Sequence, residues 1–166
     1  ISVSNNWGSS QFHIHDILMD GEGGVDGGWG MIWDGFGPGG IVENVQIHRY
    51  ASGGLLVLAG NSRATIGGTF RWNEIIGCRR NGIWRQDAIN GGLNKYLANW
   101  ILDDGASALT NGIRLGTMGS ALGDLVAGNH IGTSGTPITA SDAQDRISGN
   151  FTSTAGSAAV TYVSMA

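Results

Sequence analysis

The sequence predicts an all-β fold, a parallel β-helix in which short strands wind through stacked coils. The motif Asn-x-Ile recurs as "WNEI" at Trp72–Ile75, "ANWI" at Ala98–Ile101 and "GNHI" at Gly128–Ile131. A glycine followed by apolar residues recurs between these motifs, and no window of about 11 residues carries a helical stripe that is free of glycine. Short strands joined by Gly-, Asn-, Ser- and Asp-rich turns, at periods of about 20–30 residues, are typical of this architecture.

Each coil is expected to begin at a polar corner residue, which we call the anchor. Weaker copies of the motif, "IHDIL", "VENVQI" and "ISGNFT", complete a set of anchors that comprises Asp16, Asn44, Asn73, Asn99, Asn129 and Asn150. Their separations of 28, 29, 26, 30 and 21 residues exclude a strict repeat but allow coils with turns of variable length. We expect the anchors to stack, because Asn and Asp tolerate a left-handed corner and can hydrogen-bond the coils above and below. The column is therefore predicted to be structural rather than catalytic.

In chain order, each period is predicted to hold one short strand after its anchor and a second strand after a glycine. The second strands are expected in "GMIW" from Gly30, "GLLVL" from Gly54, "NGIW" from Asn81, "NGIR" from Asn111, "GTPI" from Gly135 and "AAVTYV" from Ala158. This gives about six coils over residues 12–166, preceded by residues 1–11 as a leading segment or partial coil.

Composition and charge exclude several classes of function. The net charge is −4 and Lys95 is the only lysine, which argues against nucleic-acid binding because phosphate recognition needs clustered cations. Arg79, Arg80 and Arg85 are expected together on one turn of an otherwise acidic surface. Cys78 is the only cysteine, so no disulfide and no thiolate metal site are expected. No apolar stretch approaches the ~20 residues that insertion into a membrane requires.

Neither a cofactor nor a metal is expected. "GFGPGG" at Gly35–Gly40 satisfies G-x-G-x-x-G, but it contains a proline and no helix follows, whereas a dinucleotide site needs a strand before the motif and a helix after it. His13 and His15 lie on one face of a strand, but two imidazoles need a further ligand to hold a metal ion. The chain begins at Ile1 rather than Met, and we expect either processing or a longer parent polypeptide.

This pattern of anchors, glycines and short strands resembles the right-handed parallel β-helix superfamily, which includes pectate-lyase-like enzymes, their glycosidase relatives and phage tailspikes. The resemblance covers residues ~12 to 163 and rests on the repeat pattern rather than on a catalytic motif. It implies a right-handed parallel β-helix. Six coils are fewer than complete enzymes of this superfamily usually have, so we expect a piece of a longer spike or fibre, in a homotrimer, with an extracellular or virion location.

The exposed face is predicted from positions relative to the anchors. One residue after successive anchors come Glu74, Trp100, His130 and Phe151. The outward positions of the second strands are Ile32, Leu56, Trp84 and Arg114. Stacking at ~5 Å would place Glu74 beside Trp100 and Trp84 beside Arg114.

An outward indole beside a charged group is suited to a sugar, because the ring covers an apolar pyranose face while the charge bonds hydroxyl groups. The sequence therefore predicts polysaccharide-binding residues, namely Trp84, Trp100, Arg114 and His130. Packing of the tryptophans under long turns or against a neighbouring subunit is the alternative.

Catalysis is an open question at this stage. A glycoside hydrolase needs two carboxyl groups, ~5 Å or ~6.5–9.5 Å apart. Glu74 and Asp103 are expected ~11 Å apart from strand and coil spacings, which is slightly too long. Asp87, in the turn "RQDAINGGLN", could approach either. If the protein is an enzyme, Glu74, Asp87 and Asp103 are the candidate catalytic residues.

Three functions are compatible with these observations. The first is a tailspike- or fibre-like segment that recognises a host surface polysaccharide and also degrades it in some members. The second is a free-standing polysaccharide lyase or glycoside hydrolase. The third is a structural spacer or adhesin segment without a ligand.

Overall fold

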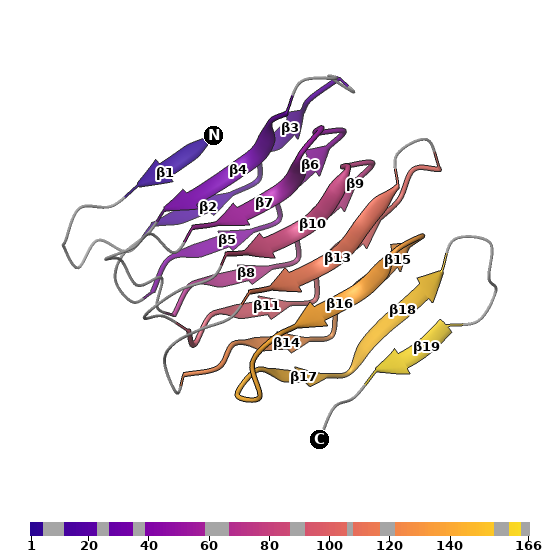
Figure 1. Cartoon of the computed structure of the whole chain (residues 1–166). Helices are drawn as coiled ribbons and strands as arrows, with labels where there is room; N and C mark the ends of the chain where they lie inside the picture. Colours follow the sequence, from indigo (N-terminus) through magenta and orange to yellow (C-terminus); the bar gives the residue numbers. More distant parts are fainter. Residues whose placement is uncertain are drawn as a thin grey trace.

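A computed structural model describes most of the chain and shows a stack of parallel strands without a helix in the described part (Figure 1). The residues that it describes are 1–4, 12–22, 27–34, 39–58, 67–86, 92–105, 108–116, 122–154 and 160–163. The strands form three sheets, and the chain visits the sheets in the same order in each coil. The prediction of an all-β parallel β-helix is confirmed.

Sheet B receives the first strand of each coil, and its members are β2 (His13–His15), β5 (Ile41–Glu43), β8 (Thr69–Arg71), β11 (Lys95–Leu97), β14 (Leu125–Ala127) and β17 (Arg146–Ser148). Sheet C follows with β3 (Leu18–Asp20), β6 (Gln46–His48), β9 (Glu74–Ile76), β12 (Trp100–Leu102), β15 (His130–Thr133), β18 (Asn150–Thr154) and β19 (Val160–Val163). Sheet A contains β1 (Ser2–Ser4), β4 (Trp29–Asp34), β7 (Gly53–Val57), β10 (Arg80–Arg85), β13 (Leu109–Leu115) and β16 (Thr136–Ala140).

The structure differs from the sequence prediction in two respects. Each complete coil has three strands instead of two, because a short strand of sheet B precedes the corner where the anchor motif lies. The complete coils are also fewer than the six predicted. After β17 and β18, the described residues Val160–Val163 of the run "AAVTYV" do not join sheet A but form β19, which pairs antiparallel with β18.

The asparagine column exists, but it is shorter than predicted. In Asn73, Asn99 and Asn129 the Nδ2 donates to the Oδ1 of the asparagine one coil further on, at 2.8–2.9 Å, and the column ends at Asn150. One coil before Asn73 the column position is Val45, whose backbone N–H donates to Asn73 Oδ1 at 3.1 Å. The assignment of Asp16 and Asn44 to the column was therefore wrong by one residue.

Asp16 and Asn44 occupy the left-handed corner, which lies one residue before the asparagine column. This corner position has a φ between 51° and 66° in every coil where its residue is described, in Asp16, Asn44, Trp72, Ala98, Gly128 and Gly149. The column asparagines themselves do not have a positive φ. Their amides instead bond backbone groups of neighbouring coils, as in Asn99 Nδ2, which donates to the carbonyl of Phe70 at 3.0 Å.

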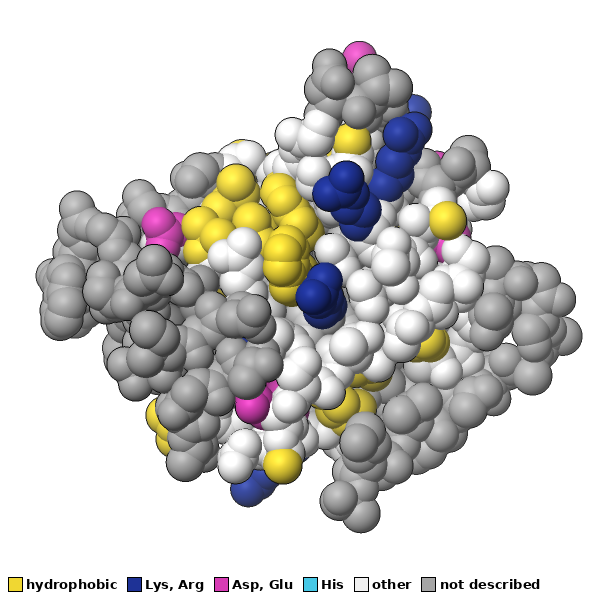
Figure 2. Space-filling view, in the orientation of Figure 1, with side chains coloured by type: hydrophobic (Ala, Val, Ile, Leu, Met, Phe, Trp, Pro, Cys, Tyr) yellow, Lys and Arg dark blue, Asp and Glu magenta, His cyan; other side chains and the backbone are white. Residues whose placement is uncertain are grey.

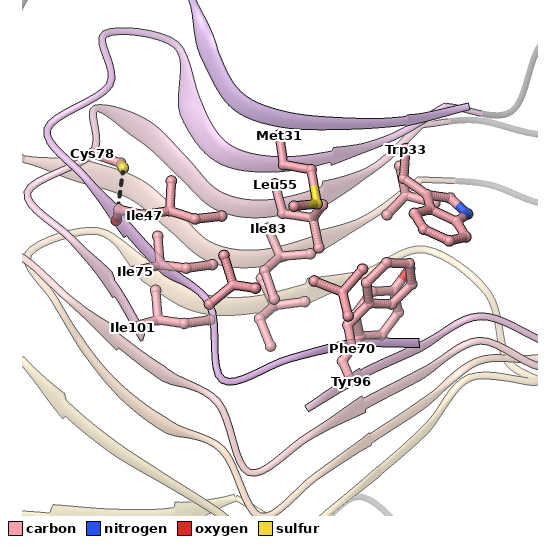
Figure 3. Packing of buried hydrophobic residues seen from close by; sticks show 14 of the residues in the cluster. Met31, Trp33, Ile47, Leu55, Phe70, Ile75, Cys78, Ile83, Tyr96 and Ile101 are labelled. Carbon is pink, nitrogen blue, oxygen red and sulfur yellow. Dashed lines mark hydrogen bonds between the residues drawn. The ribbon is translucent and has the colours of Figure 1, made fainter. Parts of the chain in front are cut away.

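The core explains why the glycine signal accompanies Asn-x-Ile. The isoleucines of sheet C point inward and stack, as Ile47, Ile75 and Ile101 do in Figure 3. Opposite them lies a column of buried glycines in sheet A. A Cβ on Gly30 would lie 2.2 Å from Ile47 Cγ2, and a Cβ on Gly82 would lie 2.4 Å from Ile101 Cγ2. A side chain at these glycines would displace the isoleucine, so sheets A and C approach closely only with glycine there.

Aromatic rings fill the opposite side of the core. Trp33 meets Phe70 edge to face at 5.7 Å between ring centroids, and Phe70 stacks on Tyr96 at 5.3 Å (Figure 3). Cys78 is buried near the isoleucines, and burial raises the pKa of its thiol to about 11. The Cys78 side chain is therefore a neutral thiol at pH 7 that packs in the core.

Candidate ligand-binding surfaces

The outward column of sheet C has the predicted neighbours. Glu74 pairs in register with Trp100, Trp100 with His130, and His130 with Phe151. The Trp100 and His130 rings stack at 5.0 Å with an interplanar angle of 18°. The Trp100 residue is 52% exposed. One face of the indole is thus supported by His130, and Glu74 lies in register on the other side.

A second exposed tryptophan lies beside this column and was missed by the sequence analysis. Trp72 is 57% exposed and occupies the left-handed corner between sheets B and C. Its neighbour Asn73 points inward to the asparagine column. The sequence signal for the exposure of Trp72 was its position directly before a column asparagine. The asparagine side chain points inward, so the residue before it, at the corner, points outward.

Trp72 and Trp100 border a common hollow of about 240 Å³, which we call the sheet C hollow. Its lining comprises Asn44, Val45, Gln46, Trp72, Asn73, Glu74, Ala98 and Trp100. His130 is absent from the lining, so it supports Trp100 from behind. The hollow therefore combines two exposed indoles with one carboxylate and the carboxamide of Gln46.

A hydrogen bond from His48 holds the Glu74 carboxylate of this hollow in place. His48 Nε2 lies 2.8 Å from Glu74 Oε1, and the Glu74 side chain is 39% exposed. The second oxygen of a carboxylate fixed in this way can accept hydrogen bonds from a ligand.

The orientation of Trp72 is set by charges on sheet B. The Arg71 guanidinium carbon lies 4.3 Å from the Trp72 ring centroid, and Arg71 Nε donates to Glu43 Oε2 at 2.6 Å. His13 lies 2.6 Å from the other oxygen of Glu43. The pKa of Glu43 is lowered, first by the hydrogen bond from Arg71 and then by that from His13. Arg71 is consequently fixed over one face of the indole.

Two of the candidate catalytic residues, Glu74 and Asp103, do not line the same hollow. Asp103 accepts the backbone N–H groups of Leu109 at 2.7 Å and Ser134 at 2.6 Å, so it organises the turn after sheet C. Glu74 lines the sheet C hollow and Asp103 does not. Asp87 lies outside the described residues. The catalytic roles of Glu74, Asp87 and Asp103 stay predictions.

The other predicted pair lies on a different sheet. Trp84 of β10 is in register with Arg114 of β13, and the Arg114 guanidinium carbon lies 5.1 Å from the Trp84 ring centroid. Trp29 approaches Trp84 at 5.9 Å between ring centroids. These residues border a hollow of about 340 Å³, which we call the sheet A groove. The four predicted binding residues thus divide into two separate surfaces, with Trp84 and Arg114 on one and Trp100 and His130 on the other.

The sheet A groove lies on the face that Figure 2 presents, where hydrophobic side chains gather beside Lys and Arg side chains. Its lining comprises Trp29, Ser52, Arg80, Asn81, Trp84, Thr110, Asn111 and Arg114. Trp29 and Arg80 were missed as binding residues. Trp29 pairs in register with Gly53 of β7, and this close pairing is visible only once the strands are aligned.

The prediction that Arg85 shares a surface with Arg79 and Arg80 was wrong. The Arg85 side chain is only 1% exposed and points into the core, while Arg79 and Arg80 are exposed. Its Nε donates to Asp124 Oδ2 at 2.9 Å, and its Nη2 lies 3.5 Å from Asp145 Oδ2. Burial is the largest cause that raises the pKa of Asp124, to about 6, and it also raises the pKa of Asp145.

A third hollow, of about 1190 Å³, lies along sheet B near this cluster, and its lining includes Asp124, Asp142 and Asp145. These carboxylates surround Arg85 at 2.9–4.0 Å. No aromatic side chain is among the described residues of the lining. The hollow therefore lacks the stacking surface that the two others share.

Comparisons of this chain with protein-family models, with curated proteins and with solved structures return no match. Within the described ranges, no helix is long and apolar enough to span a membrane. Likewise, no group of three or more His, Cys, Asp or Glu side chains in the described part of the chain could hold a metal ion.

Proposed function

We propose that this chain is a saccharide-binding segment of an extracellular or virion fibre, and that the saccharide binds in the sheet C hollow. The observation that carries the proposal is the pair of exposed indoles, Trp72 and Trp100, which line one hollow together with the Glu74 carboxylate. Large exposed aromatic groups in a concave surface mark interaction sites in soluble proteins.

The chemistry of the hollow suits a sugar ring. The indole faces cover the apolar faces of a pyranose, which removes apolar surface from water. Glu74 accepts hydrogen bonds from hydroxyl groups, and the Gln46 carboxamide both donates and accepts. His130 and Arg71 hold the two indoles before the ligand arrives, so little side-chain entropy is lost on binding.

The parallel coils support the further proposal that the segment belongs to a spike or fibre of the tailspike kind. A stack of coils is a rigid rod, in which each coil is bonded to the next along the axis. Residues of successive coils then face a polymer at a spacing of ~4.8 Å. In this proposal the fibre is a homotrimer, as in the superfamily that the repeat pattern resembles.

Binding is tested by titrating the protein with a panel of neutral oligosaccharides and following tryptophan fluorescence and heat release. Trp100→Ala and Trp72→Ala are each expected to weaken binding about tenfold or more, because each removes one stacking face. Leu18→Ala is the matched control, since Leu18 is a 63% exposed apolar residue of sheet C outside the hollow.

Circular dichroism of each variant checks that the β-helix is intact. Equal affinity of both tryptophan variants and the parent protein would contradict the proposal. So would the absence of binding to every saccharide in the panel.

A further inference from the structure

We propose that the sheet A groove is a second, separate site, which binds a saccharide that carries an anionic group such as a carboxylate, sulfate or phosphate. The groove is lined by two tryptophans and two arginines, Trp29, Trp84, Arg80 and Arg114. The saccharide part of this assignment rests on the proposed function. The anionic part rests on the arginines alone.

The aromatic wall of the groove depends on a glycine, Gly53, which has no side chain. Gly53 lies between Trp29 and Asn81 in the register of sheet A. A Cβ on Gly53 would lie 2.3 Å from Trp29 Cζ3. With glycine at this position the Trp29 indole lies over β7 and reaches Trp84, at 38° between the ring planes. The two indoles together present a broad apolar surface across two coils.

An irregularity in the strands places the first arginine. The pairing of β10 with β13 shifts between Arg80 and Asn81, because Arg80 pairs with Leu109 whereas Asn81 pairs with Asn111. Thr110 is the extra residue of this bulge. Arg80 has a φ of 59°, which a non-glycine residue adopts only at some cost. Bulges redirect side chains, and here Arg80 and Thr110 both line the groove.

No residue in the described part of the chain neutralises either arginine of the groove. Arg80 and Arg114 are both exposed and form no ion pair with any described residue. The described lining contains no carboxylate. These two positive charges lie on a chain whose net charge is −4, so they are a local feature and not a property of the whole surface. An anionic group between them would form charge-assisted hydrogen bonds.

Amide groups fix the floor of the groove. Asn111 Nδ2 donates to Asn81 Oδ1 at 2.9 Å, and Thr139 Oγ1 donates to Asn111 Oδ1 at 2.8 Å. This chain of hydrogen bonds runs along sheet A and orients both carboxamides. It adds neutral polar groups for the hydroxyls of a sugar without adding a negative charge.

The two surfaces have opposite electrostatic preferences. The sheet C hollow contains the carboxylate of Glu74 and no Lys or Arg among its lining residues. The sheet A groove contains two guanidinium groups and no carboxylate among its described lining residues. A neutral saccharide is therefore directed to the first site and an anionic saccharide to the second.

The test uses one oligosaccharide in two forms. A uronic acid oligomer is titrated into the protein as the free acid, whose carboxyl groups are ionised at neutral pH, and as its methyl ester, which has lost the charge and carries a methyl group on each carboxyl. Arg80→Gln and Arg114→Gln are each expected to weaken binding of the free acid about tenfold or more. The same variants leave binding of the methyl ester within about twofold.

The matched control is Arg79→Gln, which removes the same charge one residue away, from an exposed arginine outside the groove lining. It is expected to change the affinity for the free acid by less than about threefold, because exposed charges act only weakly through solvent. Trp84→Ala is expected to weaken binding of the free acid, while Trp100→Ala is not. Circular dichroism confirms that each variant is folded.

Additional titrations identify which anionic group the groove recognises. A sulfated and a phosphorylated oligosaccharide are titrated in parallel with the uronate, and the form that binds most tightly identifies the group. Sodium sulfate and sodium phosphate alone are expected to bind at least about tenfold more weakly, because they lack the ring that stacks on the indoles.

The inference is overturned if the free acid and the ester bind equally, or if Arg79→Gln weakens binding as much as the two groove variants. It is also overturned if every saccharide responds only to Trp72→Ala and Trp100→Ala, a result that leaves the proposed function intact. If single-stranded nucleic acid binds the groove and no anionic saccharide does, the ligand class is wrong. Failure of the proposed function alone appears as groove binding of the free acid together with neutral oligosaccharides that do not bind, or that bind Trp72→Ala and Trp100→Ala as tightly as the parent protein.

Discussion

A buried guanidinium distinguishes one coil of this protein at the scale of single residues. Arg85 occupies an inward position of sheet A where the preceding coils have Val57 and Trp33. A charge in such a position requires partners, because removal from water costs several kcal/mol. Asp124 and Asp145 supply two negative charges to one arginine, and both carboxyl side chains are 0% exposed.

The burial of these carboxyl groups makes stability depend on pH. The pKa of Asp124 rises from 3.8 to about 6, with burial as the largest cause and the charge of Asp145 as a lesser one. A raised pKa means that the fold favours the protonated carboxyl. The contribution of Asp124 to the free energy of unfolding is therefore complete below pH ~4. It is lost as the pH rises through ~6, by on the order of 3 kcal/mol. The free energy of unfolding, measured with urea between pH 4 and 8, is expected to fall across this window.

Asp145→Asn tests the cause of this pH dependence. The variant keeps the oxygen that accepts the Asp124 N–H at 2.9 Å but removes one buried charge. Its stability is expected to depend less on pH between 4 and 8. Asp20→Asn is the control, because Arg49 lowers the pKa of Asp20 and its stabilising contribution is lost only as the pH falls below ~4. Equal slopes for Asp145→Asn and the parent protein would contradict the assignment.

At the scale of the strands, two columns of stacked residues stabilise the fold. The asparagine column links the starts of the sheet C strands from β9 to β18, and the glycine column lets sheet A approach the isoleucines of sheet C. Both columns come from the same period of the sequence. A residue of one column therefore stabilises two neighbouring coils at once, which is a property of stacked repeats.

Asn99→Ala is expected to lower the free energy of unfolding by about 3 kcal/mol or more, because it leaves several buried polar groups without a partner. Asn99 Oδ1 accepts the Asn73 N–H at 3.1 Å, and Asn99 Nδ2 donates to the Phe70 carbonyl and to Asn129 Oδ1. Urea unfolding measures the loss.

Asn44→Gly is the matched control for this change, because glycine occupies the same left-handed corner at Gly128 and Gly149. Asn44 is exposed and its side chain donates to the exposed Asp16, outside the column. A loss below about 1 kcal/mol is expected there, as for most surface substitutions. Similar losses at both positions would show that the column does not carry special stability.

The whole molecule is a short rod whose coils contact mainly their neighbours. At one end β2 and β3 are the outermost strands of sheets B and C, and at the other end β16 and β17 are the outermost strands of sheets A and B. Sheet C instead ends in the antiparallel strand β19, which covers the outer side of β18. The central coils are bonded on both sides, and the terminal coils on one side only.

Hydrogen exchange is therefore expected to be uneven along the rod. In sheet C, β9 lies between β6 and β12, and β12 lies between β9 and β15, so the backbone of both strands is paired on both sides. The backbone amides of β9 and β12 are expected to exchange at least about tenfold more slowly than those of β3 and β17, because terminal coils open without unfolding the rest. Mass spectrometry of exchanged peptides measures this, and equal protection throughout would indicate that all coils open together.

Part of the candidate site could be predicted from the sequence because coils of similar length place like positions side by side. Counting from the anchors correctly paired Glu74 with Trp100 and Trp84 with Arg114. Trp72 could not be placed by this count, because its exposure depends on a corner where the chain turns between sheets. The position of Trp29 depends on the register of β4 with β7. This register could not be counted from the anchors, because the intervening turns vary in length.

The sequence by itself determined the repeat: that the strands stack in parallel, that asparagines stack at a corner of the coils, and that a glycine recurs with the isoleucines of each period. These features are local, because each follows from alternation and turn chemistry within one period. Only the tertiary structure decided the third sheet, the burial of Arg85 and the division of the predicted binding residues between two sheets. Which side chains meet across a coil depends on how its corners bend, and a bend is fixed by packing against neighbouring coils rather than by the residues of the turn alone.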